Sequence, residues 1–202
     1  MLGIEEKKQQ YFELDQLLEQ ILEHYRVGFY SLLTTYAAEF AKARGSTTNH
    51  QAWIGGYLDH VREVMNVAIV LYKSMNNLRP LPFSLSDVQT VLFIHDLEKP
   101  WAYEEVDGIW RRRPGMKECA HEIRLARLLE VGISLPHDLE RALFFVEGEG
   151  QDYNNGKRGM SPLAAFCHMC DVASARVWHD CPKSEGDYWK TTMRNPSIGA
   201  SE

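Results

Sequence analysis

The chain has 202 residues, of which 45% are hydrophobic and 25% charged, a composition that excludes global disorder and is typical of a folded globular domain. Its formal net charge is −6, with 22 basic against 28 acidic residues, which argues against a broad nucleic-acid surface but leaves a local basic patch open. The sequence contains no run of about 18 apolar residues that predicts a membrane helix. Residues 1–16 are too polar for a signal or transit peptide, and the four cysteines suit reduced thiols, so we expect a cytoplasmic protein.

The spacing of apolar residues predicts helices along most of the chain. The first helical region covers residues 10–42, with a break expected near Gly28. A helix from Ser84 or Ser86 to Pro100 has a serine available as its N-cap. Further helices are predicted over residues 52–75, 118–131, 136–147 and 161–178.

The segments between these helices carry turn residues. Residues 103–116 contain Asp107-Gly108 and Pro114-Gly115, which predict a loop or a short hairpin, and residues 148–160 predict a surface loop. The polar residues from 180 onward predict a peripheral tail. Because the strand–helix alternation of a parallel sheet is missing, we predict an all-α fold in a single domain.

Four polar residues stand within apolar helical sequence, where an uncompensated polar group is costly. They are His60, the adjacent pair His95 and Asp96, and Asp171. Imidazole and carboxylate together suit Mn, Fe, Co, Ni, Zn or Mg. Ligands this far apart in sequence can meet between facing helices, as in other helix bundles. Each residue taken singly also suits a hydrogen-bonded core group.

The order of these residues, H…HD…D, resembles the signature of the HD-domain superfamily of metal-dependent phosphohydrolases. The flanking sequences GGYLDH, HDLEKP and SPLA are similar to those around the family's ligands. The resemblance spans about residues 49–178 and implies a single HD-type helical bundle with its metal site between helices. In that arrangement, helices within residues 1–45 pack on the core of residues 49–178, and residues 180–202 form the tail.

The resemblance also implies a role for each residue. His60, His95, Asp96 and Asp171 would hold a divalent metal, and Asp96 would thereby belong to the catalytic group. Lys99, which matches the lysine after the family's HD pair, would neutralise phosphate charge.

Two positions bear on whether a second metal binds. His121 falls where many two-metal members have a further histidine, and it suits either a metal ligand or a helix-capping or surface residue. Where the family often has a pair of histidines, this chain has Val146-Glu147. Glu147 could be an oxygen ligand, a general base or a solvated acid at a helix end, or its presence could mean that one metal binds.

A basic cluster and several aromatic residues are candidates for substrate binding. The cluster contains Arg111, Arg112 and Arg113, with Arg124 further along, and it suits a polyanion anchor or a solvated charge run. His50 could line the substrate pocket or cap a helix. The aromatic residues, which could stack on a base or belong to the core, are Trp53, Trp101, Tyr103 and Trp110.

These features predict a metal-dependent phosphohydrolase that acts on a nucleotide, either a (d)NTP or a short oligonucleotide. The net charge of −6 counts against a long nucleic acid. Two alternatives share the fold that the resemblance implies. One is an HD-type mixed-valent diiron oxygenase, which should need histidines in place of Val146-Glu147, and the other is a non-catalytic HD module that binds a ligand.

Overall fold

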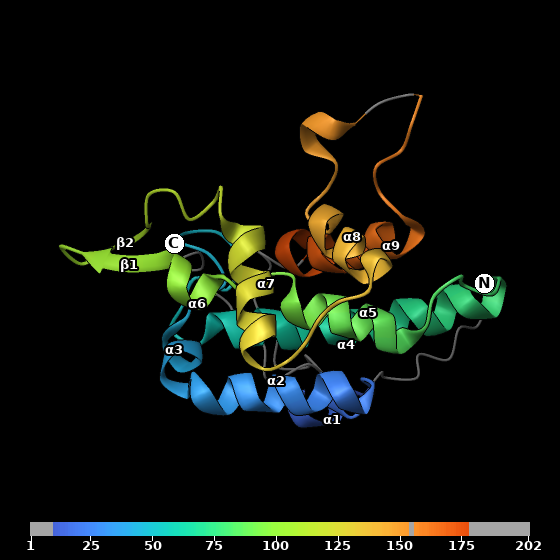
Figure 1. The fold of residues 1–202 in the computed structure, drawn as a ribbon, viewed down its shortest axis with the longest axis horizontal. Coiled ribbons are helices and arrows are strands. Elements are labelled where there is room, and N and C mark those ends of the chain that lie inside the picture. Colours follow the sequence, from blue (N-terminus) through green and yellow to red (C-terminus); the bar gives the residue numbers. More distant parts are fainter. Residues whose placement is uncertain (1–9, 154–155, 178–202) are drawn as a thin grey trace, which may run out of the picture.

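The structure, a computed structural model, describes residues 10–153 and 156–177. It is mostly helical, as predicted, with a small antiparallel sheet (Figure 1). The first helices are α1 (Leu14–Leu18), α2 (Glu23–Thr35), α3 (Ala37–Lys42), α4 (Gly56–Leu78), α5 (Leu85–Ile94) and α6 (Lys99–Ala102). They are followed by β1 (Tyr103–Val106), β2 (Ile109–Arg112), α7 (Ala120–Glu130), α8 (His137–Phe145), the short 3₁₀ turn η1 (Gly150–Asp152), α9 (Pro162–Val172) and the π-helical turn η2 (Ala173–Val177). The predicted tail lies outside the described residues.

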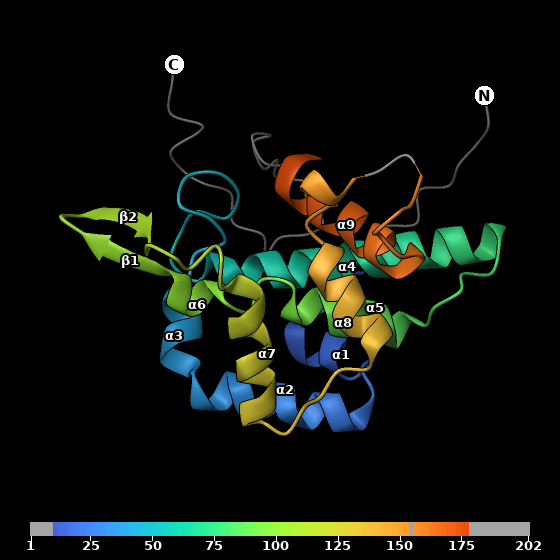
Figure 2. The same cartoon turned by 45° about the horizontal axis from the view of Figure 1, so that its top comes forward.

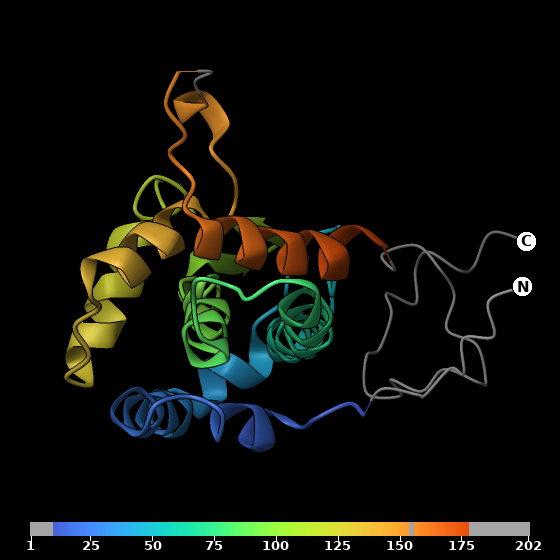
Figure 3. The ribbon, with the colours of Figure 1, turned by 90° about the vertical axis from the view of Figure 1, so that its right-hand side faces the viewer.

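Helices α4 and α5 lie side by side at the centre of the molecule. Seen along these two helices, α9 covers one side of the pair and α1 and α2 cover the opposite side (Figure 3). The interior is filled by fully buried apolar side chains, including Phe29, Phe40, Tyr57, Met65, Leu92, Phe93 and Phe166. None of the helices that the structure describes combines the length and apolar character that crossing a membrane requires.

The break predicted near Gly28 is wrong, because Gly28 lies within α2. The chain instead leaves the helical path between α1 and α2 and again at Tyr36. A Cβ atom at position 28 would lie 2.5 Å from Cδ1 of Ile133, so the glycine allows α2 to approach the segment after α7 closely. This glycine therefore serves packing and not helix termination.

The start of α5 follows the sequence, whereas its end does not. Ser84 is the N-cap, and its hydroxyl and the carboxylate of Asp87 form a capping box. The helix ends at Ile94 instead of continuing to Pro100. The backbone N–H of Lys99 bonds to the carbonyl of Asp96, three residues back, and this tight turn replaces the helical pattern. The turn contains the His95-Asp96 pair.

A hairpin of β1 and β2 extends away from the helices (Figure 2), in agreement with the predicted short hairpin. Asp107 and Gly108 at its tip have φ values of 54° and 78°, the combination that a type I′ turn requires. The register pairs Tyr103 with Arg112 and Glu105 with Trp110, so these four side chains share one face of the hairpin.

Candidate metal centre

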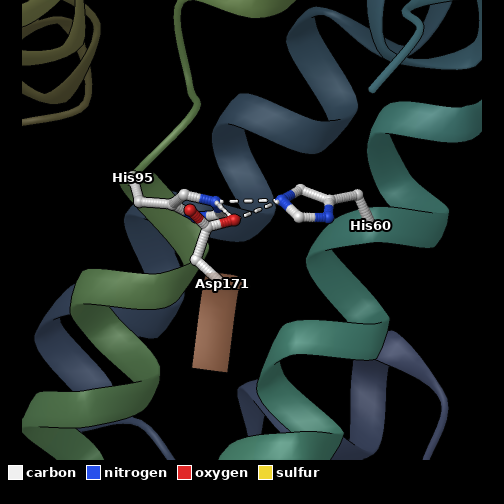
Figure 4. Close-up of side chains that lie close together, drawn as sticks. All are labelled: His60, His95 and Asp171. Atoms are coloured by element: carbon white, nitrogen blue, oxygen red, sulfur yellow. Dashed lines mark hydrogen bonds and ion pairs between the residues drawn. The ribbon is translucent and has the colours of Figure 1, made fainter. Parts of the chain in front are cut away.

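Three side chains from three helical segments converge at one point (Figure 4). His60 lies in α4, His95 follows α5, and Asp171 lies in the last turn of α9. His60 Nε2 lies 3.2 Å from His95 Nε2 and 3.2 Å from Asp171 Oδ1, and His95 Nε2 lies 3.8 Å from the same oxygen. Among the described residues this is the one group of three or more His, Cys, Asp or Glu side chains that could hold a metal ion.

Hydrogen bonds on the far side of each imidazole fix which nitrogen faces the cluster. His95 Nδ1 lies 2.6 Å from the carbonyl oxygen of Leu92, which can only accept, so Nδ1 carries the proton. The hydroxyl of Ser174 donates to Glu63 Oε2 at 2.9 Å, so its oxygen, 3.1 Å from His60 Nδ1, accepts a hydrogen bond from the Nδ1–H of that ring. When both rings are neutral, the Nε2 atom of each is therefore unprotonated, and the two Nε2 lone pairs face each other.

The buried network behind His60 contains residues that the sequence analysis missed. Gln51 donates to the same carboxylate oxygen of Glu63 at 2.7 Å, and both residues and Ser174 are buried. Ser174 lies in the π-helical turn directly after α9, three residues after Asp171. That spacing puts it on the same side of a helix as Asp171, a signal that would have identified it. Such outer hydrogen bonds commonly orient metal-binding histidines.

The distances and charges of the cluster fit a cation. Two nitrogens that each bind one metal at about 2.1 Å lie roughly 3.0–3.4 Å apart at octahedral or tetrahedral angles, and the two Nε2 atoms fall in that range. Burial alone would lower the pKa of His95, but Asp96 and Asp171 raise it to about 9. Burial would raise the pKa of Asp171, yet the neighbouring imidazoles bring it to about 2. The cluster thus favours a positive charge at its centre, whether proton or metal.

Asp96 lies beside the triad and is held by Lys99. Its Oδ2 is 3.4 Å from His60 Nε2 and 3.3 Å from His95 Nε2, and it also pairs with the Lys99 ammonium. Burial would raise the pKa of Asp96, but Lys99 and His95 hold it well below its usual range. Lys99 also donates to the carbonyl of Gly45, and the pKa of this buried lysine is raised because Asp96 outweighs desolvation. Lys99 is therefore a fixed positive charge next to the cluster.

Asp171 of the triad lines a cavity of about 590 Å³, whereas His60 and His95 are fully buried behind it. The predicted site residues that line it are Asp96, Lys99, Asp171, His50, Arg111, Arg112 and Glu147, and the remaining lining residues are Gly45, Ser46, Thr47, Asn49, Tyr103, Trp110 and Lys117. Burial, with help from His60 and Lys99, lowers the pKa of His50 to about 3, so its ring is neutral at pH 7. Its Nε2 atom is buried and has no hydrogen-bond partner among the described residues. His50 thus keeps a buried polar atom without a partner next to the cavity.

The basic cluster divides between the two faces of the hairpin. Arg112 shares the face of Tyr103, donates to its hydroxyl at 3.1 Å and lines the cavity. Arg111 also reaches the cavity, but its guanidinium is exposed and lies 3.2 Å from Glu104. Arg113 lies 3.7 Å from the same carboxylate and is not among the described residues that line the cavity. Of these three arginines, Arg112 is therefore the best placed to contact a ligand in the cavity.

Arg124 lies in α7 and its side chain is buried. Its Nε donates to Glu98 at 2.7 Å, and its Nη2 donates to Glu147 at 2.6 Å. Glu98 is only 1% exposed, so the guanidinium compensates a carboxylate that water does not reach. Arg124 is not among the described residues that line the cavity, whereas Glu147 lines it. These contacts indicate a structural role for Arg124 in place of the predicted substrate contact.

His121 is not brought to the triad. Its ring packs edge-on against Phe144, and its Nε2 lies 3.9 Å from Glu140. Together with His137 these side chains line a separate, smaller hollow between α7 and α8. Among the described residues, the group that could share a metal does not include His121. The structure thus separates His121 from the other predicted ligands.

Replacing Ser174 with alanine should weaken metal binding by roughly 10- to 100-fold, because His60 Nδ1 would lose the acceptor that fixes its tautomer. Isothermal titration calorimetry with Mn²⁺ or Zn²⁺ measures this change. Ser84→Ala is the matched control, since it removes a helix cap and about 1 kcal/mol of stability without touching the triad. Equal metal affinity in Ser174→Ala and wild type would contradict the assigned role.

The arrangement can therefore hold a cation beside a cavity that carries Lys99, Arg112 and Lys117. The same cavity is lined by the carboxylates of Asp96, Asp171 and Glu147, of which Asp96 is paired with Lys99 and Glu147 with Arg124. Arg112 and the exposed Lys117 therefore remain to attract an anionic ligand. Comparison of the chain with family models, characterised proteins and solved structures gave no significant match.

Proposed function

We propose that the protein is a metal-dependent phosphohydrolase that acts on a nucleotide. The observation that carries this proposal is the triad His60, His95 and Asp171 next to a cavity that Asp171 lines together with Lys99 and Arg112. The resemblance of H…HD…D and its flanks to the HD-domain superfamily supports the same assignment. The metal would be Mn, Mg, Co, Ni, Zn or Fe, all of which accept nitrogen and oxygen ligands.

The ligand set would consist of His60, His95 and Asp171, with Asp96 as the adjoining carboxylate. A divalent ion bound there would lower the pKa of a coordinated water and act as a Lewis acid toward phosphorus. Lys99, held in place by Asp96 and the Gly45 carbonyl, would place a positive charge next to the phosphoryl oxygens as negative charge develops on them. Its buried position spares the reorganisation that an exposed lysine would undergo.

Two further groups would act on the substrate from the cavity wall. Arg112 presents a planar set of donors that suits phosphate oxygens. Glu147 lies at the edge of the cavity with its side chain 60% exposed and one oxygen bound to Arg124. A carboxylate in that position could accept a proton from the attacking water.

A mass-spectrometric product screen tests the proposal. Purified protein with Mn²⁺ is incubated with nucleoside mono- and triphosphates, cyclic nucleotides and short oligonucleotides, in parallel with Asp96→Ala. We expect wild type to convert at least one of these, and the variant to lose more than about 100-fold of that rate, the scale of removing one strong electrostatic contact. Conversion of none of them, or equal conversion by Asp96→Ala, would contradict the proposal. Iron-dependent oxygen uptake would instead favour the oxygenase.

A further inference from the structure

The aromatic residues near the cavity differ in how far their surfaces are already used. Trp53 donates its Nε1–H to Asp59 at 2.8 Å. Trp101 packs edge-on against Tyr36 and Phe40 and has the guanidinium of Arg127 4.3 Å from its ring centre. Neither tryptophan is among the described residues that line the cavity next to the triad.

Trp110 lines that cavity, and one of its faces is covered by Arg44. The guanidinium carbon of Arg44 lies 4.8 Å from the centre of the Trp110 ring, and its Nη1 donates to the carbonyl of Ala52 at 3.2 Å. Arg44 is not among the described residues that line the cavity, whereas Trp110 is. From this difference we infer that the face of Trp110 opposite Arg44 is the one that a ligand in the cavity can reach.

The hairpin holds this ring next to charged groups. Trp110 and Arg112 lie two residues apart in β2 and share a face with Tyr103, which also lines the cavity. Lys99, Asp96 and Asp171 lie on the wall formed by the helices. A ligand that fits both parts has a flat aromatic group at one end and a phosphate at the other.

We propose that Trp110 is the platform on which the nucleobase of the substrate stacks, with Arg44 as its support and the phosphate directed toward Lys99 and the triad. The direction of the phosphate rests on the proposed function, whereas the stacking does not. Because the contact uses the π-face that every base has, it distinguishes a nucleotide from a sugar phosphate without selecting one base. Arg44 strengthens the platform through its cation–π contact.

Calorimetric titration with AMP, UMP and ribose 5-phosphate tests this proposal. The protein is first treated with chelator, so that binding is measured without turnover, and the titration is repeated with Ca²⁺. We expect AMP and UMP to bind more tightly than ribose 5-phosphate. Trp110→Ala should weaken nucleotide binding roughly 5- to 150-fold and leave ribose 5-phosphate unchanged. Trp110→Phe should retain most of the affinity, because a ring remains.

Ile109→Ala is the matched control, since Ile109 lies on the same strand, is 68% exposed and points to the other face. Equal binding of AMP, UMP and ribose 5-phosphate would overturn the proposal, as would undetectable binding of all three. An equal loss for all three ligands in Trp110→Ala would also overturn it, because that result indicates a wall residue only. Base-dependent binding without any hydrolysis would retain the platform and refute the phosphohydrolase. Nucleotide hydrolysis at an unchanged rate in Trp110→Ala would instead support the phosphohydrolase and refute the platform.

Discussion

Replacing Asp171 with alanine should abolish metal binding and nucleotide hydrolysis together. Its Oδ1 lies 3.2 Å from His60 Nε2 and 3.8 Å from His95 Nε2, so it is the carboxylate that completes the triad. Without it, the cation keeps two imidazole nitrogens and Asp96, whose Oδ2 is already paired with the Lys99 ammonium. A hard divalent cation that prefers oxygen as well as nitrogen ligands would then lack an unshared carboxylate. We expect metal affinity and kcat/KM each to fall by more than about 100-fold, beyond the loss typical of outer hydrogen-bonding partners.

The matched control is Met169→Ala, on the same helix and 44% exposed. Metal content after gel filtration and calorimetry with Mn²⁺ should be unchanged in this variant. Circular dichroism of Asp171→Ala should retain the helical spectrum, so that a loss of metal is not confused with unfolding. Retention of wild-type metal affinity in Asp171→Ala would show that the triad is not the metal site.

Replacing Arg124 with methionine should lower the free energy of unfolding by about 3–5 kcal/mol, because Glu98 would be left buried without its partner. For a domain of this size, that loss corresponds to a fall in Tm of roughly 6–20 °C. Differential scanning calorimetry measures the change. Combining Arg124→Met with Glu98→Leu should recover most of the loss, since it removes both buried charges.

The exposed pair of Arg111 and Glu104 provides the comparison for this prediction. Their side chains are 58% and 30% exposed and lie 3.2 Å apart, so Arg111→Met should change stability by less than about 1 kcal/mol. If Arg124→Met were as stable as Arg111→Met, the buried pair with Glu98 would not carry the role assigned here.

The parts of the fold that the sequence predicts are those with short-range causes. The cap at Ser84 and the turn at Asp107-Gly108 depend on residues within a few positions, and both were predicted. His60 and His95 were identified because an imidazole in an apolar helical segment needs a partner. Their meeting with Asp171 depends on how α4, α5 and α9 pack, which spacing along the chain suggests without fixing any distance.

The residues that sequence reasoning placed wrongly or missed depend on tertiary contacts. Arg124 follows a basic run in the chain, but its position in α7 turns it inward to Glu98. Gly28 resembled a helix breaker, although its function is the close approach of Ile133. Ser174 stands three residues after Asp171, but its bonds to His60 and Glu63 depend on how the π-helical turn after α9 packs on α4.

The most direct test of the central claim is hydrolysis in H₂¹⁸O. Protein stripped of metal by chelator and then reloaded with Mn²⁺ is given the nucleotide that it converts, and the products are examined by mass spectrometry. Because water attacks phosphorus, we expect one ¹⁸O atom on the phosphorus whose bond is broken, and we expect both chelator and Asp171→Ala to prevent its incorporation. Three results would contradict a metal-dependent phosphohydrolase. They are the absence of product from every nucleotide, ¹⁸O in the sugar, and turnover that persists in excess chelator.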